Sequence, residues 1–501
     1  MNAERERKEM SEISQYTWLF GITCVWACID SYGIGANDVA NSFSTSVGAK
    51  TLTLKQACMI ASVTEMAGAY LLGANTASTL SKSVIKIELF KHKPELLMLA
   101  MFCALVGSST WTLTATRMGW PVSTSHAIIG ALIGVGIAGF GPQAIIWGFD
   151  GVARIVSSWF ISPLAAGLVA SVIFVTTRSL VLKHDNSFER GLRAIPIYFG
   201  ATALIDASYV LLRNDANTLD TAAIIKISTC VVISLAVTLF CWFMFVPFIR
   251  RKLLVGENLR WFHVFVIPFL PTQQLVSDIS IEAPKDKAPQ EPRGMFGKLK
   301  AHIHKVLNVE IHPTHDEHVQ RVMDTAERYD PNTEYMYSIL QIATACMSSF
   351  AHGSNDIANA VGPLSTVYHV WSQGRIPSEI TIPSWVLLMG GLAMDVGLLT
   401  YGYKIFQSLG AKITYLSPSR GFSMELGTSL TVVSCSRLGL PVSTTHCITG
   451  ATAAVGLCNG SVSSINWRML GWCFFSWFLT LPAAGCTAGL VFFLCSRSPV
   501  L

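Results

Sequence analysis

Stretches of about twenty mostly apolar residues recur along the chain, and this length matches the hydrocarbon core of a lipid bilayer. With 51% hydrophobic and only 13% charged residues, the chain of 501 residues is too apolar for a soluble protein of its size. The sequence therefore predicts an all-α membrane protein, embedded in the lipid bilayer, with about twelve transmembrane helices. The apolar windows lie at 16–36, 52–74, 96–116, 122–140, 156–182, 194–212, 222–248, 335–352, 384–408, 422–436, 441–458 and 470–495.

A polar segment divides these windows into two membrane blocks. It carries the Pro-rich, mixed-charge run APKDKAPQEPRG, which is typical of a loosely folded loop. No small-residue cleavage site follows the first apolar window, so we predict a retained first helix rather than a removable signal peptide. The predicted organisation is an N-terminal tail at 1–15, a first block of about seven helices at 16–248, the polar loop at 249–334, a second block of about five helices at 335–495 and a C-terminal tail at 496–501.

The distribution of Lys and Arg predicts how the chain is oriented in the membrane, and the net charge bears on whether it binds nucleic acid. Placing the loop in the cytosol collects the larger set of Lys and Arg residues on the cytosolic side, as the positive-inside rule requires. We therefore predict both termini outside and the loop inside, with the plasma membrane as the location. The net charge of +5 gives no reason to expect a nucleic acid partner. The thirteen Cys contain no CxxC and predict buried apolar side chains rather than disulfides or a metal site.

A pair of polar motifs occurs twice inside the apolar segments. GANDVAN at 35–41 is followed, about 84 residues after its Asn-Asp, by GWPVSTSHAIIGALIGVG. GSNDIAN at 353–359 is followed at nearly the same interval by GLPVSTTHCITGATAAVG. The same two motifs in the same order indicate an internal duplication. Because the first copy opens after one span and the second after about eight, the copies should face opposite directions. This predicts two inverted-topology repeats, as in many secondary transporters.

The motifs place polar groups where hydrocarbon would penalise them unless the backbone lines a cavity or pairs with protein. Gly35 and Gly353 would let each helix break or let another backbone come close. A broken helix offers free N–H groups and a positive dipole end to an anion, and its free carbonyl groups suit a cation. The two PVST motifs begin with Pro and supply hydroxyl groups that cap a helix or donate to a ligand. We therefore predict broken helices around a shared binding site.

The two acids of the duplicated motif narrow the choice of ligand. Asp38 and Asp356 lie beside donors suited to an anion, with no Lys or Arg adjacent. A carboxylate tolerates an anion if a cation lies between them or if the anion carries a proton. Phosphate carries protons near neutral pH and sulfate does not, so the pattern favours phosphate with a coupling cation. The alternative is purely structural, with Ser and Thr only capping helices and Asn only joining them.

Other polar groups within the apolar windows are candidates for transport roles. Glu65, Asp395 and Glu425 are intramembrane acids, which are by default candidate ion or proton sites. The alternative is an acid that bonds to a neighbouring helix or lies near the membrane edge. His126 and His446 close the two hydroxyl motifs, and either could handle protons or simply be a buried imidazole.

Three segments resemble the two signature halves of the inorganic phosphate transporter (PiT) family, in particular its eukaryotic, sodium-coupled type. They are GANDVANSFSTSVGAKTLTLKQACMIASVTEMAGAYLLGA, GSNDIANAVGPLS and SRGFSMELGTSLTVVSCSRLGLPVSTTHC. The resemblance covers nearly all of both membrane blocks but not the loop. It implies phosphate symport driven by a sodium gradient, with sodium as coupling ion and no cofactor, in a chain that forms homodimers.

The resemblance also implies roles for individual residues. It places phosphate at Asn37, Asp38, Ser123, Thr124, Ser125, Asn355, Asp356, Ser443, Thr444 and Thr445. It places sodium at Asp38, Asn41, Asp356 and Asn359. Glu65 and Glu425 stand where the family has acids needed for transport. Asp395 stands at roughly the place of Glu65 in the second repeat, with a slightly different interval to the next Gly.

We therefore predict a secondary active importer of inorganic phosphate, coupled to sodium and working by alternating access, and not an enzyme. Proton coupling, or sulfate as the transported anion, remains open on the same scaffold. An intramembrane enzyme with Asp38 and Asp356 as a dyad is an alternative of another class, but no HExxH, GxSxG or nucleotide-binding loop supports it. A non-transporting phosphate sensor or surface receptor is a further alternative, for which the loop is the positive hint.

Overall fold

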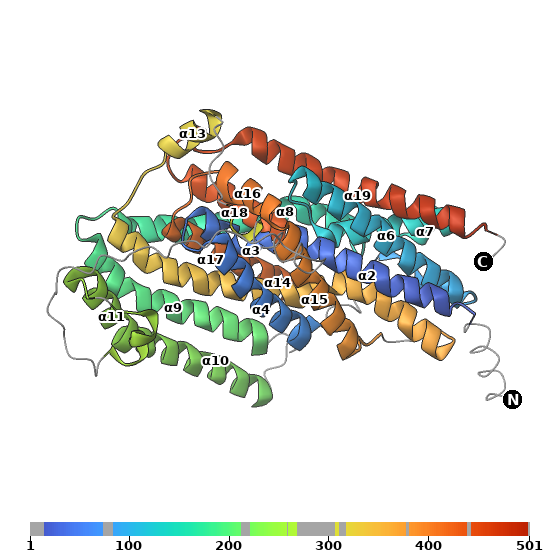
Figure 1. Cartoon of the computed structure of the whole chain (residues 1–501), viewed down its shortest axis with the longest axis horizontal. Coiled ribbons are helices and arrows are strands. Elements are labelled where there is room, and N and C mark those ends of the chain that lie inside the picture. The colour runs from blue at the N-terminus through green and yellow to red at the C-terminus, as the bar shows by residue number, and fades with distance from the viewer. Residues whose placement is uncertain are drawn as a thin grey trace, which may run out of the picture.

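The computed structural model describes residues 15–73, 84–211, 221–257, 259–267, 306–309, 317–376, 380–437 and 442–498. Within these ranges the chain is helical, apart from an isolated β-bridge between Ile85 and Ile145 (Figure 1). The first block contains α2 (Thr17–Asn37), α3 (Ala40–Gly48), α4 (Leu54–Leu72), α6 (Pro94–Met118), α7 (Thr124–Phe140), α8 (Val152–Thr177), α9 (Ser187–Leu211), α10 (Thr221–Phe240) and α11 (Val246–Arg250). After α13 (Glu317–Asp324), the second block contains α14 (Pro331–Gln373), α15 (Ser384–Tyr401), α16 (Tyr403–Lys412), α17 (Pro418–Arg437), α18 (Thr444–Leu457) and α19 (Trp467–Cys495).

Every predicted apolar window coincides with one or more of these helices, so the all-α membrane fold is confirmed. Within the described ranges, seven helical segments are long and apolar enough to cross a membrane: Thr17–Gly48, Pro94–Met118, Val152–Leu182, Ser187–Leu211, Ala223–Val255, Ser384–Tyr401 and Trp467–Cys495. Most of the predicted loop at 249–334 lies outside the described residues.

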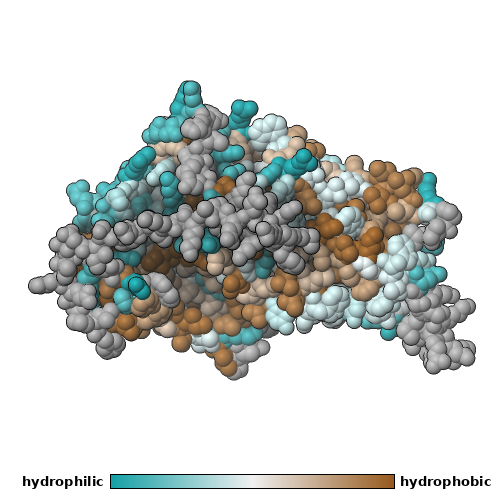
Figure 2. All heavy atoms as spheres, viewed as in Figure 1, coloured by the Kyte–Doolittle hydropathy of each residue, from teal (hydrophilic) through white to brown (hydrophobic). Residues whose placement is uncertain are grey.

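The apolar surface is unevenly distributed over the helices. In Figure 2, hydrophobic side chains cover the lower edge, where α9 and α10 lie, and the upper right, over α19. Exposed side chains in these regions include Val232 and Leu235 on α10 and Phe478 on α19. Hydrophilic residues gather instead near α13. Because apolar surface of this extent is stable against lipid and not against water, these faces fit a bilayer.

The two repeats run in opposite directions, as the duplicated motifs predict. Phe20, near the start of α2, stacks on Trp371 at the end of α14, with ring centroids 4.7 Å apart. Beyond the end of α3, Thr51 donates a hydrogen bond of 2.7 Å to Gln341 near the start of α14. The start of α2 and the end of α19 lie at one end of the molecule, and α11 and the start of α14 lie at the other (Figure 1).

The repeats are interlocked, because the second helix of each packs against the motif helix of the other. A Cβ atom added at Gly35 of α2 would lie 1.9 Å from the Met394 carbonyl oxygen of α15, and one at Gly353 of α14 would lie 2.3 Å from the Glu65 carbonyl oxygen of α4. Of the two uses predicted for these glycines, the structure shows the close approach and not a helix break at the glycine itself. Helix α14 is continuous through Gly353, and α2 continues through Gly35. Both glycines serve close backbone approach instead.

Two helical hairpins enter this interlocked pair from opposite ends. The α6–α7 hairpin is closed at its base by the rings of Phe90 and Phe140, 4.9 Å apart, and the α17–α18 hairpin by a 2.7 Å hydrogen bond from Arg420 to Asn459. Each hairpin tip carries one PVST motif. In the first hairpin Gly119, in the left-handed conformation, ends α6. Ser123 and Ser443 cap the second helices of the two hairpins, so each hairpin brings a helix N-terminus into the interior.

Candidate functional site

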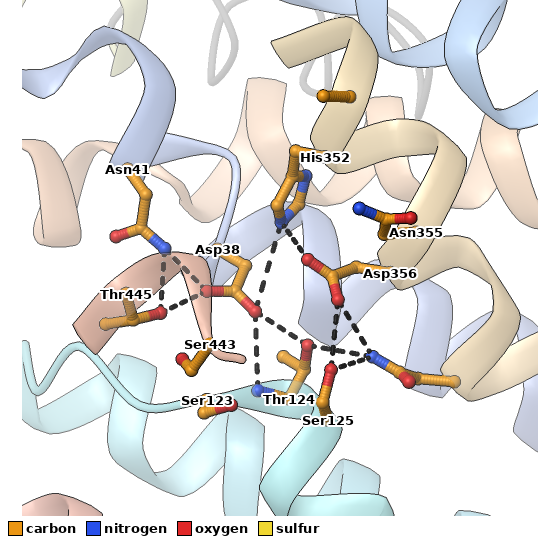
Figure 3. Close-up of polar contacts among 12 residues, drawn as sticks. Asp38, Asn41, Ser123, Thr124, Ser125, His352, Asn355, Asp356, Ser443 and Thr445 are labelled. Atoms are coloured by element: carbon orange, nitrogen blue, oxygen red, sulfur yellow. Dashed lines mark hydrogen bonds and ion pairs between the residues drawn. The ribbon is translucent and has the colours of Figure 1, made fainter. Parts of the chain in front are cut away.

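The two NDxxN motifs and the two PVST motifs meet where the inverted repeats cross (Figure 3). Helix α2 ends at Asn37 and α3 begins at Ala40, and the two residues between them, Asp38 and Val39, form an irregular turn with right-handed helical backbone angles. The carboxylates of both motif acids are buried: Asp38 is 2% exposed, and Asp356 of α14 is 7% exposed. The convergence of the four motifs, which lie far apart in the sequence, makes this the candidate site.

Asp38 accepts hydrogen bonds from three other parts of the site. Its Oδ1 accepts from Asn41 Nδ2 and from Thr445 Oγ1, each at 2.6 Å. Its Oδ2 accepts from Thr124 Oγ1 at 2.6 Å and from the Thr124 backbone N–H at 3.3 Å. The first-repeat carboxylate is therefore held by both hairpin tips. Hydrogen bonds to an ionised acceptor are about twice as strong as neutral ones.

Asp356 repeats this arrangement with the repeats exchanged. Its Oδ1 accepts from Ser125 Oγ at 3.0 Å and from Asn359 Nδ2 at 3.3 Å. Asn359 also donates to Ser125 Oγ at 2.9 Å, just as Asn41 donates to Thr445 Oγ1 at 2.8 Å. Each carboxylate therefore binds the Asn three residues later and the third hydroxyl group of the opposite repeat. The duplication seen in the sequence is a two-fold arrangement of contacts.

The N-termini of the two hairpin helices point at this site, as the PVST motifs predict. Ser123 caps α7 by accepting from the His126 backbone N–H at 3.3 Å, and Ser443 caps α18 by accepting from the His446 backbone N–H at 3.4 Å. Two positive helix ends therefore converge beside the two carboxylates. The capping role of both Ser is confirmed. A direct contact between either Ser and phosphate stays a prediction.

Asn37 joins the motif helix to the hairpin of its own repeat. Its Nδ2 donates to Thr116 Oγ1 at 2.9 Å and to the Trp120 carbonyl group at 3.0 Å, and its Oδ1 accepts from the Val122 backbone N–H at 3.0 Å. With both ends of the amide engaged, Asn37 positions the tip of the α6–α7 hairpin. Its predicted contact with phosphate would require some of these bonds to open.

Asn355 of the second repeat has different surroundings. Its Oδ1 accepts a hydrogen bond of 3.4 Å from the Tyr209 hydroxyl group, so a helix outside the repeats, α9, reaches the site. Thr444, another predicted phosphate ligand, lines a cavity together with Tyr209, Asp206 and His352. This cavity of about 20 Å³ lies next to the central carboxylates and is large enough for about one water molecule.

His352 lies among the buried acids of the site, although the duplicated motifs do not predict it. Its Nδ1 lies 2.9 Å from Glu65 Oε2, and its Nε2 lies 2.9 Å from Asp356 Oδ2 and 4.0 Å from Asp38 Oδ2. The corresponding position of the first repeat is Ile34, so the duplication gives no sign of His352. A His one turn before an Asp in an apolar segment is the signal that could have revealed it. Its ring can donate to carboxylates on both sides only when it carries two protons.

The two other predicted acids, Glu65 and Glu425, are buried at separate places along α14. Glu65 of α4 accepts from Ser349 at 3.0 Å in addition to its contact with His352. The Glu425 carboxylate of α17 lies one to two turns nearer the start of α14 and accepts from four side chains: Thr45, Ser46 at 3.1 Å, Thr344 at 2.5 Å and Gln341 at 3.4 Å. The acids extend the polar path from the centre towards the loop end.

Asp395 is not the counterpart of Glu65. The carbonyl group that approaches Gly353 belongs to Glu65, and the one that approaches Gly35 in the other repeat belongs to Met394. Asp395 is therefore one position out of register and lies half-buried on α15. The interval to the next Gly, which differs between the two segments, reflects this offset. A transport role for Asp395 stays a prediction.

His126 and His446 lie side by side behind the hairpin tips. Their ring centroids are 4.9 Å apart, and His446 stacks on Trp477 with centroids 3.9 Å apart. Neither ring nitrogen of His446 has a hydrogen-bond partner among the described residues. The pair contributes apolar packing between the tips, and a role in proton handling stays a prediction.

The chemistry of the site suits a cation and an anion together. One oxygen each of the Asp38 and Asp356 carboxylates lies within 4.8 Å of the other and of a His352 ring nitrogen, so both carboxylates could contact one cation. Asn41 Oδ1 is buried without a partner among the described residues, so the predicted sodium ligand has a free oxygen. Within the described chain, neither carboxylate forms an ion pair with Lys or Arg. Oxygen donors of this kind are those that hard cations prefer.

Comparison with known proteins agrees with this site. A model of the phosphate transporter family matches residues 34–488. The phosphate-repressible phosphate permease of Neurospora crassa is 34% identical, with 97% of this chain and 99% of the permease covered. The sodium-dependent phosphate transporter 2 of Felis catus is 28% identical, with 94% and 97% covered. A solved structure described as the sodium-dependent phosphate transporter has a TM-score of 0.70 and 29% identity, with 95% of this chain and 99% of that chain covered.

These matches include both repeats and both hairpins, and the matched proteins are transporters. The chain therefore belongs to the phosphate transporter family and is an integral, multi-pass membrane protein that transports phosphate, not an enzyme.

Proposed function

We propose that the chain imports inorganic phosphate across the plasma membrane by sodium-coupled symport, with alternating access to the site at Asp38 and Asp356. The observation that carries the proposal is the pair of buried carboxylates facing two helix N-termini without a pairing Lys or Arg. An anion drawn to the helix ends meets two negative charges. Bound sodium ions neutralise these charges, so the anion binds favourably only after or together with sodium.

The hydrogen-bonding groups support phosphate over sulfate. Ser125 and Thr445 donate to the carboxylates and can turn towards a bound oxyanion. Hydrogen phosphate also carries a proton that it can donate to a carboxylate oxygen, whereas sulfate at neutral pH offers only acceptors. The Felis catus relative and the solved structure are sodium-dependent phosphate transporters, which supports sodium as the coupling ion.

Basic residues support the cytosolic placement of the loop. Arg178 pairs with Glu327 at 2.5 Å, and Arg420 donates to the Glu327 carbonyl group at 2.8 Å, so both arginines lie at the loop end. Partial burial opposes ionisation of Glu327, but hydrogen bonds from Tyr329 and Arg178 hold the pKa of its carboxyl group below the usual value. By the positive-inside rule, these arginines support a cytosolic location for this end.

The proposal is tested by phosphate uptake into proteoliposomes. An inward tenfold sodium gradient coupled to one ion per phosphate can sustain about a tenfold accumulation, and more ions give a steeper one. We expect accumulation with this sodium gradient, none with an equal choline gradient, and no inhibition by excess sulfate. Accumulation driven equally well by a proton gradient without sodium would overturn the coupling, and strong competition by sulfate would overturn the substrate assignment.

Replacing His352 should reveal the competition between its imidazole and the cation. In His352→Ala the carboxylates of Glu65 and Asp356 lose a shared partner, and removal of one member of a buried ion pair costs about 3–5 kcal/mol. Sodium can then take the place of the imidazole. We expect a lower unfolding temperature in choline chloride, largely restored by sodium chloride, in detergent-purified protein.

His446→Ala is the matched control, because it removes a buried imidazole that has no carboxylate partner in the described structure. It should lower stability equally in both salts. If sodium stabilises His352→Ala no more than it stabilises His446→Ala, the imidazole does not occupy a cation position.

A further inference from the structure

A buried acid outside the duplicated motifs lies on α2, two turns before the central site. Asp30 is 1% exposed, and among the residues that the structure describes neither of its carboxylate oxygens has a hydrogen-bond partner. Its position eight residues before Asp38 places it about 12 Å from that residue along the helix axis, towards the end where the chain termini lie. The corresponding residue of the second repeat is Ser348, so Asp30 is not part of the two-fold arrangement.

Helix α6 has two buried hydroxyl groups beside this part of α2. Ser108 faces the Asp30 carboxyl group but does not reach hydrogen-bond geometry. Thr112, one turn further along α6, packs its methyl group beside Gly33 of α2, and its buried hydroxyl group also lacks a partner in the described chain. Most buried Ser and Thr of a helix bond to the carbonyl group four residues earlier. Ser109 does so with Leu105 at 2.7 Å, which shows that Ser108 and Thr112 are held differently.

The free groups continue as far as the central site. Thr116, one turn beyond Thr112, accepts the 2.9 Å hydrogen bond from Asn37, the residue next to Asp38. A stripe of oxygen atoms on α6, at Ser108, Thr112 and Thr116, thus leads from Asp30 to the carboxylate cluster. It approaches from the side opposite to Glu65 and Glu425.

A carboxylate with no donor on either oxygen is unstable in a membrane interior unless an ion or a proton compensates it. Within the described part of the chain, the unpartnered buried polar atoms of Asp30, Ser108 and Thr112 are all oxygens. An all-oxygen set with one negative charge matches a small hard cation. We infer that Asp30, Ser108 and Thr112 form a second sodium site, separate from the one at Asp38 and Asp356. The inference rests on the proposed sodium coupling and adds one coupling ion to it.

The experiment measures binding of radiolabelled sodium, without phosphate, to purified full-length protein. The starting protein is the double variant Asp38→Asn and Asp356→Asn, in which the two central carboxylates have lost their charges. We expect this protein to retain saturable sodium binding, and the addition of Asp30→Asn to abolish it. Ser108→Ala should weaken the retained binding, whereas Ser109→Ala, whose hydroxyl group is bonded to its own helix, should leave it unchanged.

Transport of phosphate by single variants separates this inference from the proposed function. In otherwise unchanged protein, Asp30→Asn should leave sodium-driven uptake measurable but raise the sodium concentration for half-maximal uptake and reduce the steepness of its sodium dependence. Normal sodium binding and sodium dependence in Asp30→Asn, while wild-type uptake is sodium-driven, would overturn the second site alone. Wild-type uptake that ignores sodium would overturn the proposed function first. Gel filtration of each variant excludes loss through misfolding.

Discussion

Phosphate uptake by Asp38→Asn is expected to fall at least about 100-fold below wild type, because a loss of about 3 kcal/mol in ion binding corresponds to that factor. The substitution keeps the shape of the side chain but removes its charge. Thr124 and Thr445 would then donate to a neutral amide group, and the cation would lose its principal ligand. Initial uptake of labelled phosphate into proteoliposomes under a sodium gradient measures the effect.

The two-fold arrangement of contacts predicts the same loss of uptake for the equivalent substitution in the second repeat. Asp356→Asn should lower uptake by a similar factor, because Ser125 and Asn359 bind Asp356 as Thr445 and Asn41 bind Asp38. Asp150→Asn changes an exposed acid and serves as the control that should retain uptake. Uptake at the wild-type level in either central variant would show that the site has been placed wrongly.

Gly35→Ala is expected to destabilise the fold although alanine is the better helix former. An Ala in place of Gly in an exposed helix interior stabilises by about 0.5–1 kcal/mol. At Gly35 the new methyl group would lie 1.9 Å from the Met394 carbonyl oxygen, and overpacking of a close-packed interior costs about 1–3 kcal/mol. The net change should lower the unfolding temperature in detergent and reduce the monodisperse yield.

Gly21→Ala on the same helix is the matched control. Nothing lies within 4 Å of a Cβ added at Gly21, so helix propensity alone should decide, and the unfolding temperature should stay the same or rise. Opposite signs for the two substitutions are the expected result. If both variants are equally stable, α2 and α15 tolerate a wider separation than the structure shows, and the glycine contact has no importance for the interlock.

The sequence predicted the convergence of Asp38 and Asp356 because a duplication in opposite orientation brings equivalent positions together. It could not separate the two uses of glycine, since a helix break and a close approach both require the missing side chain. The partner that distinguishes them, Met394 for Gly35, lies more than three hundred residues away. Only the packing of the helices reveals that contact.

Other parts of the site were hidden for different reasons. His352 has no equivalent His in the first repeat, so the duplicated motifs do not indicate it. The engagement of Asn37 with Thr116 and Val122 depends on how the hairpin tip folds back, which no local pattern encodes. Asp30 falls within an apolar window, where a single acid did not change the prediction of a membrane helix. The duplication therefore predicted which residues converge, but not the unduplicated His352 or the partners that Asn37 takes up.

The continuous course of α14 implies that the two halves do not contribute equally to motion. Helix α14 runs for 43 residues, about 64 Å, between the two ends of the molecule, and Pro363, one turn beyond Asn359, lies in its interior. The first half has instead an irregular turn at Asp38 and Val39, at the level of the carboxylate cluster. The first repeat therefore has an irregular turn at its Asn-Asp motif, whereas the helix of the second repeat continues through its own. We expect opening and closing to be recorded mainly as a change of angle between α2 and α3.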